Sequence, residues 1–406
     1  MWAKYKLSEL GAIVGGATPS TSVEKYYGGE IAWVTPKDLS SFSGRYIECG
    51  ERNITEEGLN SCSAQLLPAG SVLFSSRAPI GYVAIAKNPI ATNQGFKSLV
   101  PDTKKVDSLF MYYLLKYNKN RIEAMGSGTT FKEVSGATMK NIEVNLPPLA
   151  EQKRIAAILG ALDDKIELNR RINANLEEQA QALFKSWFVD FEAQNSNPGF
   201  FNDIIQTTLS GDWGQETPKG NYTSEVYCIR GADIPDIKCG DKGKLPTRFI
   251  LEKNLENKKL SENDLVVEIS GGSPTQSTGR ICLITRALLD RLGKDVICTN
   301  FCRALKPIPD YSFFIYLYWQ YLYNNNIMFS YENGTTGIKN LNITDLINKE
   351  PIIIPKKKKI LEFNNVLQSI FDMIYKNGRE NEHLSALRDT LLPKLMAGNF
   401  SRKCCN

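Results

Sequence analysis

The sequence predicts a mixed α/β protein with two pseudo-symmetric globular domains, separated by two long helices that pack as an antiparallel coiled coil. Three observations predict this architecture: the length of 406 residues, an internal duplication, and two long stretches with heptad spacing. At roughly 150 residues per domain, this length corresponds to two or three domains. Hydrophobic residues at 42% and charged residues at 23% are sufficient for buried cores, which excludes a mostly disordered chain.

The chain repeats itself at an offset of about 207 residues, which indicates two copies of one domain. Thr92-Asn93 in the first half corresponds to Thr299-Asn300 in the second, and Gly128-Thr129-Thr130 corresponds to Gly334-Thr335-Thr336. Short apolar runs bounded by Gly, Ser and Pro predict strands in both copies, at 71–74, 82–86, 265–269 and 281–284.

Each copy ends in a helical stretch whose apolar and Asn residues alternate in steps of four and three, which is a heptad seam. In the first copy the seam residues are Ile155, Leu159, Leu162, Ile166, Asn169, Asn173 and Leu176. In the second they are Phe363, Leu367, Ile370, Ile374, Asn377, Asn381 and Leu384. Two amphipathic helices on separate cores would explain the apolar positions. They would not explain Asn at the same two positions in both copies, which favours helices paired in one register.

Pro, Gly and Asn residues, which end helices and strands, divide the chain into six segments. We expect globular domains at 1–147 and 201–350, a first spacer helix at 148–191 and a second at 351–398. The polar stretch 192–200 is expected to be a linker, and 399–406 a tail.

The cysteine and histidine content limits which disulfides, metal sites and catalytic groups the chain can form. Nine cysteines without a Cys-x-x-Cys pair, and a single histidine, His383, predict free thiols, no structural metal and no His-based catalytic triad. The N-terminal residues do not resemble a signal peptide, and no apolar stretch reaches the ~18 residues of a membrane span. We therefore expect a cytoplasmic protein. Its net charge of +5 permits a polyanionic partner.

Enzyme signatures are weak or absent. The chain has no Gly-x-x-x-x-Gly-Lys-Ser/Thr phosphate loop and no Gly-x-Gly-x-x-Gly after a predicted strand. Asn145-Leu146-Pro147-Pro148 resembles only loosely the catalytic loop of amino-methyltransferases. Asp236 with Glu256 and Lys258 fits a loose metal-nuclease spacing, but the surrounding stretch is too polar for the strand that would align them.

Donor-rich loops recur in both copies instead. Arg, Lys, Asn and Gln form bidentate hydrogen bonds to base edges, and Ser, Thr and Lys hold phosphates, although such clusters also form ordinary turns. In the first copy the candidates for DNA binding are Lys37, Ser75, Ser76, Arg77, Asn93, Gln94, Lys97, Thr129, Thr130 and Lys132. In the second they are Arg230, Ser273, Thr275, Gln276, Arg280, Asn300, Thr335, Thr336, Lys339 and Asn340.

The basic run Lys356-Lys357-Lys358-Lys359 stands at the expected start of the second helix, where positive charge opposes the helix dipole. Lys153-Arg154 occupies the corresponding place in the first copy. A phosphate backbone near both helix starts would compensate these charges.

Several segments resemble the specificity subunits of type I restriction-modification systems. They include Gly16-Ala17-Thr18-Pro19-Ser20, Trp33 to Leu39, the run Gly70 to Gly81, Ala91 to Lys97, and the closing Leu387 to Met396. The second domain departs from the family pattern, with Gly271-Gly272-Ser273 where the first copy has a Ser-Arg-Ala-Pro run.

This resemblance implies that each globular domain is a target-recognition domain that reads one part of a bipartite, asymmetric site in double-stranded DNA. The helices would set the distance between the two parts and dock two modification subunits. Those subunits would bind S-adenosylmethionine and methylate adenine, and restriction subunits with ATP- and Mg-dependent activity would join them. The chain itself would hold no cofactor and would not be an enzyme.

Two other hypotheses remain open on the sequence alone. The duplicated domains could bind proteins and form a scaffold without DNA, in which case any DNA binding would lack a steep dependence on salt. A self-sufficient nuclease or methyltransferase would be active as the purified chain and would depend on Glu256.

Overall fold

The computed structural model describes residues 2–40, 42–128, 132–190, 196–273, 276–334 and 339–398. The chain divides into two compact units. Unit 1 contains residues 1–167 and 384–406, and unit 2 contains residues 168–383. Each long helix therefore contributes residues to both units. We call the described residues between 2 and 146 head 1, and those between 196 and 355 head 2.

Head 1 is built on two sheets. A five-stranded sheet has the order β2-β9-β6-β7-β4, and a three-stranded sheet has the order β5-β3-β8. Their strands are β2 (Gly11–Gly15), β3 (Tyr27–Val34), β4 (Tyr46–Ile47), β5 (Arg52–Ile54), β6 (Val72–Ser76), β7 (Ile80–Ala86), β8 (Ile90–Thr92) and β9 (Lys97–Pro101). Side chains of β6, such as Val72 and Phe74, are fully buried, as expected of an apolar central strand.

Head 2 repeats this plan with a four-stranded sheet, β12-β19-β15-β17, and a three-stranded sheet, β14-β13-β18. The strands are β12 (Ile205–Ser210), β13 (Tyr222–Ile229), β14 (Thr247–Leu251), β15 (Leu265–Glu268), β17 (Ile281–Leu283), β18 (Val296–Cys298) and β19 (Cys302–Pro307). The parallel pair β3–β8 corresponds to the parallel pair β13–β18. The duplication predicted from the sequence is therefore present in the fold.

Each head is closed by a two-stranded sheet at its chain ends. In head 1, β1 (Ala3–Lys6) pairs with β10 (Glu143–Leu146), and in head 2, β11 (Ser196–Phe200) pairs with β22 (Pro351–Pro355). The second half of the expected linker is thus a strand, because the duplicated plan places it opposite β22. A small sheet with the order β16-β21-β20 completes head 2, from β16 (Ser270–Gly271), β20 (Glu332–Asn333) and β21 (Lys339–Leu341).

One aromatic helix fills the core of each unit: α4 (Ser108–Tyr117) in unit 1 and α11 (Ser312–Asn324) in unit 2. Both bury most of their side chains, as expected of helices without a polar face. The shorter helices are α1 (Leu7–Leu10), α2 (Pro36–Ser40), α3 (Glu56–Asn60), α5 (Lys119–Ala124), α6 (Gly136–Asn141), α8 (Ile234–Lys238), α9 (Glu252–Lys258), α10 (Arg286–Leu292) and α12 (Ile343–Lys349).

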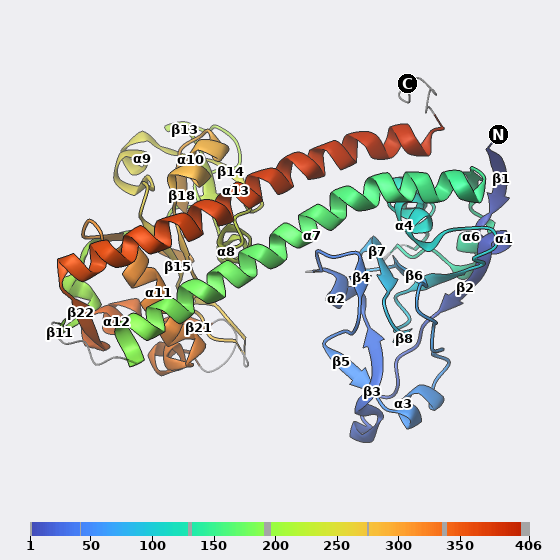
Figure 1. The fold of residues 1–406 in the computed structure, drawn as a ribbon, viewed down its shortest axis with the longest axis horizontal. Helices are drawn as coiled ribbons and strands as arrows, with labels where there is room; N and C mark the ends of the chain where they lie inside the picture. The colour runs from blue at the N-terminus through green and yellow to red at the C-terminus, as the bar shows by residue number, and fades with distance from the viewer. Residues whose placement is uncertain are drawn as a thin grey trace. The chain divides into compact units, whose positions relative to one another are not determined.

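The two predicted long helices are α7 (Leu149–Lys185), followed by a π-helical turn at Ser186–Asp190, and α13 (Lys357–Met396). They run antiparallel within each unit (Figure 1). In unit 2, Asn169 donates to Asn381 at 2.9 Å, and Asn377 donates to Asn173 at 2.8 Å. All four Asn side chains are buried. The Asn positions of the two seams therefore meet each other, which fixes the register of the helices in unit 2.

The apolar seam residues Ile155, Leu159, Ile166, Phe363, Leu367 and Ile374 are buried, whereas Leu162, Leu176, Ile370 and Leu384 are only partly buried. In unit 1 the buried position beside Leu162 is Asp163, which is 4% exposed. Its carboxylate accepts from Arg388 of α13 at 2.6 Å and from Tyr113 of α4 at 2.6 Å. Burial raises the pKa of Tyr113, and the nearby Asp163 carboxylate adds to this, so Tyr113 stays a donor.

Two lysines of the basic run at the start of α13 have partners within unit 2. Lys359 donates to the main-chain oxygen of Trp187 at 2.8 Å, and Lys357 lies 3.4 Å from the carboxylate of Asp310. Because the helices are antiparallel, the positive charge meets the carbonyl-rich end of the first long helical segment. This contact gives Lys359 a partner without the phosphate expected from the sequence.

In the part of the chain that the structure describes, no helix is long and apolar enough to cross a bilayer. The cysteines described there are free thiols. Within the same residues, no group of three or more His, Cys, Asp or Glu side chains is arranged to bind a metal ion. Glu256 lies on the short helix α9 instead of a strand, as the polar composition of that stretch indicates.

Candidate nucleic-acid interface

Three charged side chains meet at one end of the inner strands β6 and β9 in the large sheet of head 1. Arg77 directly follows β6, Lys97 begins β9, and Glu133 lies opposite Arg77 in an isolated β-bridge. The Glu133 carboxylate is 3.5 Å from the guanidinium of Arg77 and 3.3 Å from the ammonium of Lys97. Two cations share one carboxylate, so the cluster has a net positive charge. Glu133 also restricts where both cations point.

The loop between β8 and β9 adds amide groups beside this cluster. Asn93 uses its side-chain oxygen to accept from the Gly95 amide at 2.9 Å, which closes a tight turn. Gln94 is exposed and accepts a hydrogen bond from the hydroxyl of Thr18. Gln94 therefore keeps its amide nitrogen as a donor, while Asn93 has a structural role in the turn.

Two predicted residues of head 1 lie inside it. Ser75 and Ser76 are fully buried. Ser75 donates to the Pro79 carbonyl at 2.8 Å, and Ser76 donates to the Gly95 carbonyl at 3.1 Å. Their hydroxyls have no surface for a nucleic acid and instead connect strand β6 to the neighbouring loops. Polar composition alone cannot distinguish such satisfied hydroxyls from exposed ones.

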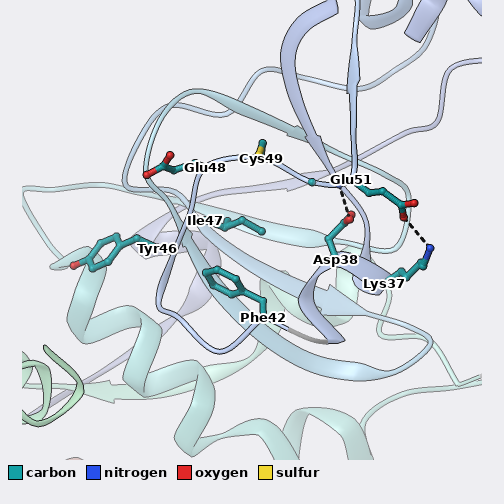
Figure 2. A pocket seen from close by; sticks show the side chains of 9 residues that line it. Lys37, Asp38, Phe42, Tyr46, Ile47, Glu48, Cys49 and Glu51 are labelled. Carbon is teal, nitrogen blue, oxygen red and sulfur yellow. Dashed lines mark hydrogen bonds and ion pairs between the residues drawn. The ribbon is translucent and has the colours of Figure 1, made fainter. Parts of the chain in front are cut away.

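Lys37 lies beside a surface pocket of about 620 Å³, shown in Figure 2. Its ammonium is 2.8 Å from Glu51, and Asp38 and Glu48 also line the pocket. The hydrogen bond with Glu51 raises the pKa of Lys37. Three carboxylates line this pocket with one lysine, so its negative charge disfavours the binding of a phosphate. Lys132, another predicted residue of head 1, is exposed and directly precedes Glu133 in the sequence.

Head 2 has the same main-chain arrangement as head 1 at this place but carries different side chains. The amide of Val134 donates to the Ser76 carbonyl in head 1, and the amide of Leu341 donates to the Ile269 carbonyl in head 2. This correspondence places Ser270 at the position of Arg77 and Asn340 at the position of Glu133. The hydroxyl of Ser270 donates to the side-chain oxygen of Asn340. A neutral hydroxyl–amide pair thus replaces the ion pair of head 1.

The predicted cations of head 2 are mostly paired. Arg280 contacts the buried carboxylate of Glu268 through two nitrogens, at 2.6 and 2.7 Å. This hydrogen bond raises the pKa of Arg280. Arg230 makes a similar fork with Asp233, at 2.9 and 3.0 Å. Both arginines therefore stabilise head 2, and part of each guanidinium is already occupied by a carboxylate.

Lys339 lies 2.9 Å from Glu332 and 4.6 Å from the ring centre of Phe329. Burial alone would raise the pKa of Glu332, but the bonds from Lys339 and Thr278 hold it below its usual value. Arg303 occupies the position of Lys97, and its Nε has no hydrogen-bond partner among the described residues.

The remaining candidates of head 2 are placed only in part. Asn300 and Gln276 are exposed. The hydroxyl oxygen of Ser273 accepts a 3.0 Å hydrogen bond from the main-chain amide of Gln276. Five predicted residues of the two heads lie outside the described part of the chain: Thr129, Thr130, Thr275, Thr335 and Thr336.

The loop alignment expected from the sequence is wrong by one residue. The main-chain amide of Asn93 donates to the Val34 carbonyl, and the main-chain amide of Thr299 donates in the same way to the Ile229 carbonyl. Asn93 therefore corresponds to Thr299. Asn300 then corresponds to Gln94, and the exposed Phe301 corresponds to Gly95. Phe301 and Glu133 are not among the residues predicted from the sequence. The strand register identifies Phe301, since Cys302 and Phe96 are the equivalent buried residues after the loop.

Comparisons with known proteins agree with this frame. Residues 1–178 match the family model described as the type I restriction modification DNA specificity domain. The chain is 35% identical to the type I restriction enzyme MjaIX specificity subunit of Methanocaldococcus jannaschii, over 98% of this chain and 93% of that protein. The chain belongs to the type I restriction enzyme specificity subunits.

A second relative is the HindI specificity subunit of Haemophilus influenzae, which is 25% identical over 98% of this chain and 99% of the relative. The crystal structure of a type I restriction-modification S subunit from M. genitalium has the same fold. Its TM-score is 0.51 at 18% identity, covering 97% of this chain and 96% of that one.

Specificity subunits are the non-catalytic components of type I restriction-modification enzymes, and they recognise the DNA target within the complex. The modification and restriction subunits bind S-adenosylmethionine and ATP. DNA and these subunits are therefore the partners of this chain. The sequence prediction of the family is confirmed.

Proposed function

We propose that this specificity subunit recognises a two-part, asymmetric site in double-stranded DNA, with head 1 contacting one part and head 2 the other. In this proposal residues 1–147 and 201–350 are target-recognition domains, and 148–191 and 351–398 are spacer helices. The segments 192–200 and 399–406 are connecting and terminal segments. One observation carries the proposal: equivalent positions on a duplicated frame hold Arg77, Lys97 and Glu133 in head 1, but Ser270, Arg303 and Asn340 in head 2.

The side chains at these positions suit different base edges. Arginine forms a bidentate contact with guanine, and asparagine or glutamine does so with adenine. Arg77 of head 1 is a candidate for guanine, and the exposed Asn300 of head 2 is a candidate for adenine. Lys97, Lys132 and Lys339 are candidates for phosphate contacts, which position a protein on the duplex without selecting a sequence.

The paired helices are proposed to hold the two contact regions at a fixed separation along the duplex. The buried Asn pairs support this role, because a polar pair on the seam prevents the helices from sliding by a turn. A separation near one DNA turn, roughly 34 Å, would let both heads reach one face of the duplex.

Exposed apolar residues on the long helices are the proposed contacts for two modification subunits, which methylate adenine. Restriction subunits are proposed to join the complex of this chain with its modification subunits. In unit 2, Leu168 and Ile172 on α7 are 43% and 37% exposed, and Val366 and Met373 on α13 are 41% and 44% exposed. Apolar side chains at helical spacing on a surface are typical of sites where another helix packs.

The experiment is a titration of the assembled modification complex with duplex DNA by fluorescence anisotropy, between roughly 50 and 200 mM salt. We expect a cognate duplex to bind more tightly than a scrambled one, with an affinity that falls steeply as salt rises. Lys97→Ala should reduce the slope of log K against log salt by about 1. Lys4→Ala is the matched control, because Lys4 is an exposed lysine of strand β1 that pairs with Glu143 in the same way as Lys97 pairs with Glu133.

A scaffold that binds only proteins would give a different result. It would bind cognate and scrambled duplexes equally weakly, and Lys97→Ala would leave the salt dependence unchanged. Either result would contradict the proposed function.

A further inference from the structure

Phe301 is an apolar side chain in a place where head 1 has none. It is 59% exposed, more than any other large apolar side chain among the described residues. It lies between β18 and β19, directly after the exposed Asn300. Its equivalent in head 1 is Gly95, which has no side chain. An exposed phenylalanine at this position therefore distinguishes the two heads.

The backbone that carries Phe301 is held on both sides. The Phe301 carbonyl accepts from the Ile269 amide at 2.9 Å and from the Ser270 amide at 3.3 Å. The next residue, Cys302, is fully buried and donates its amide to Thr299 at 2.9 Å. Thr299 in turn donates to Ile229 of β13 at 2.9 Å. The side chain thus projects from a fixed strand connection, and its exposure is a property of the folded sheet.

Neutral polar side chains stand beside Phe301, and the charged Arg303 and Lys339 lie on the adjoining strands β19 and β21. Ser270 and Asn340 form the hydroxyl–amide pair described above, and Asn300 is exposed beside Phe301. Asparagine hydrogen-bonds the N6 and N7 atoms of adenine, and phenylalanine makes apolar contact with the 5-methyl group of thymine. Both groups are presented in the major groove, so adjacent Asn and Phe side chains fit a sequence rich in A·T pairs.

We propose that Phe301 contacts the 5-methyl group of a thymine in the part of the DNA site that head 2 recognises, next to an adenine contacted by Asn300. This inference rests on the proposed function, because it requires head 2 to enter the major groove. Gly95 makes no equivalent contact in head 1. The two parts of the site therefore differ in their dependence on thymine methyl groups.

The test uses the assembled modification complex and its cognate duplex, with each thymine replaced in turn by deoxyuridine, which removes only the methyl group. The thymines are assigned to heads by the base preferences that Arg77→Ala and Asn300→Ala alter. With the unchanged chain, one replacement in the head 2 part should weaken binding on the order of fourfold, the factor expected for one buried methyl-sized group. With Phe301→Ala that loss should disappear, and replacements in the head 1 part should give the same effect as before.

Ile353→Ala is the matched control, because Ile353 is another exposed apolar residue of head 2 and lies on β22. It should retain the deoxyuridine effect. The proposal is overturned if no thymine in the head 2 part shows the effect, or if Phe301→Ala retains it. It is also overturned if Phe301→Ala instead lowers the amount of modification subunit that copurifies with the chain. Loss of the proposed function would look different, because the unchanged complex would then not distinguish cognate from scrambled DNA at all.

Discussion

Asn377 of α13 donates a 2.8 Å hydrogen bond to the side-chain oxygen of Asn173 on α7, and both side chains are buried. Asn173 in turn donates to the main-chain oxygens of Cys239 and Ile374, each at 2.9 Å. One residue thus connects the two long helices to the end of α8. Gly378, next to Asn377, makes this approach possible, because a Cβ there would lie 1.9 Å from the Gly240 carbonyl oxygen.

Removing this connection should destabilise unit 2. Asn173→Ala leaves Asn377 and two main-chain carbonyls without their partner, which we expect to lower the free energy of unfolding by about 1–3 kcal/mol. Asn175→Ala is the control, since Asn175 is exposed on the same helix. Urea unfolding of the full-length chain, followed by tryptophan fluorescence, measures both. Equal stability of the two variants would contradict a structural role for the buried pair.

The ion pair between Asp163 and Arg388 should behave as a buried pair in unit 1. Arg388→Met leaves the Asp163 carboxylate buried without its cation, and we expect a loss of about 3 kcal/mol in the free energy of unfolding. The double variant Asp163→Leu with Arg388→Met should recover part of that loss, because no charge then remains buried and only the Tyr113 hydroxyl loses its acceptor. Lys25→Ala, which removes an exposed pair with Glu57, should cost at most about 1 kcal/mol. A double variant less stable than Arg388→Met would contradict this account.

Spacer length should follow helix length. Seven residues inserted into α7 after Glu167 and seven into α13 after His383 keep both heptad seams in register. The insertion adds roughly 10 Å to each helix at 1.5 Å per residue. We expect the gap between the two recognised parts to grow by about three base pairs, at 3.4 Å per base pair. Insertion into α7 alone should break the seam and prevent assembly. Sequencing of methylated sites from cells with each variant measures the gap, and an unchanged gap would show that the helices do not set it.

Ser76 and Arg77 are neighbours in sequence but should give opposite phenotypes. Ser76→Ala removes a buried hydrogen bond and should lower stability by about 1 kcal/mol, with DNA affinity unchanged. Arg77→Ala should preserve stability and weaken cognate DNA binding by about 1–3 kcal/mol, because a bidentate base contact is lost. Thermal unfolding and anisotropy titration of the same preparations separate the two effects. Weakened DNA binding in Ser76→Ala at unchanged stability would contradict the buried role of this hydroxyl.

Much of this architecture follows from periodicity. Heptad spacing predicted both helices and placed Asn at facing positions, because the pattern repeats in each copy and depends on local geometry. It did not predict Asp163 as the buried neighbour of Leu162, because the compensating partners, Arg388 and Tyr113, are distant in sequence. Distances of that kind are set by tertiary packing, which a pattern of apolar residues does not encode.

The candidate site was predicted less completely for a related reason. Polar composition selected Arg77, Lys97 and Asn300, which remain candidates, and it also selected Ser75 and Ser76, whose hydroxyls are satisfied inside head 1. The same composition cannot show that Arg280 is already bound by Glu268. Phe301 is not predicted from the sequence because apolar residues are expected to be buried, and only the strand register shows that it replaces Gly95.

In the proposed function, two unlike heads of one chain each recognise one part of a DNA site. The most direct test is to map methylated adenines in cells that carry this chain with its modification subunits, in three versions: unchanged, Arg77→Ala, and Asn300→Ala. The account predicts a two-part motif in which Arg77→Ala relaxes only one part and Asn300→Ala relaxes only the other. A continuous motif, or a change in both parts caused by either single substitution, would contradict it.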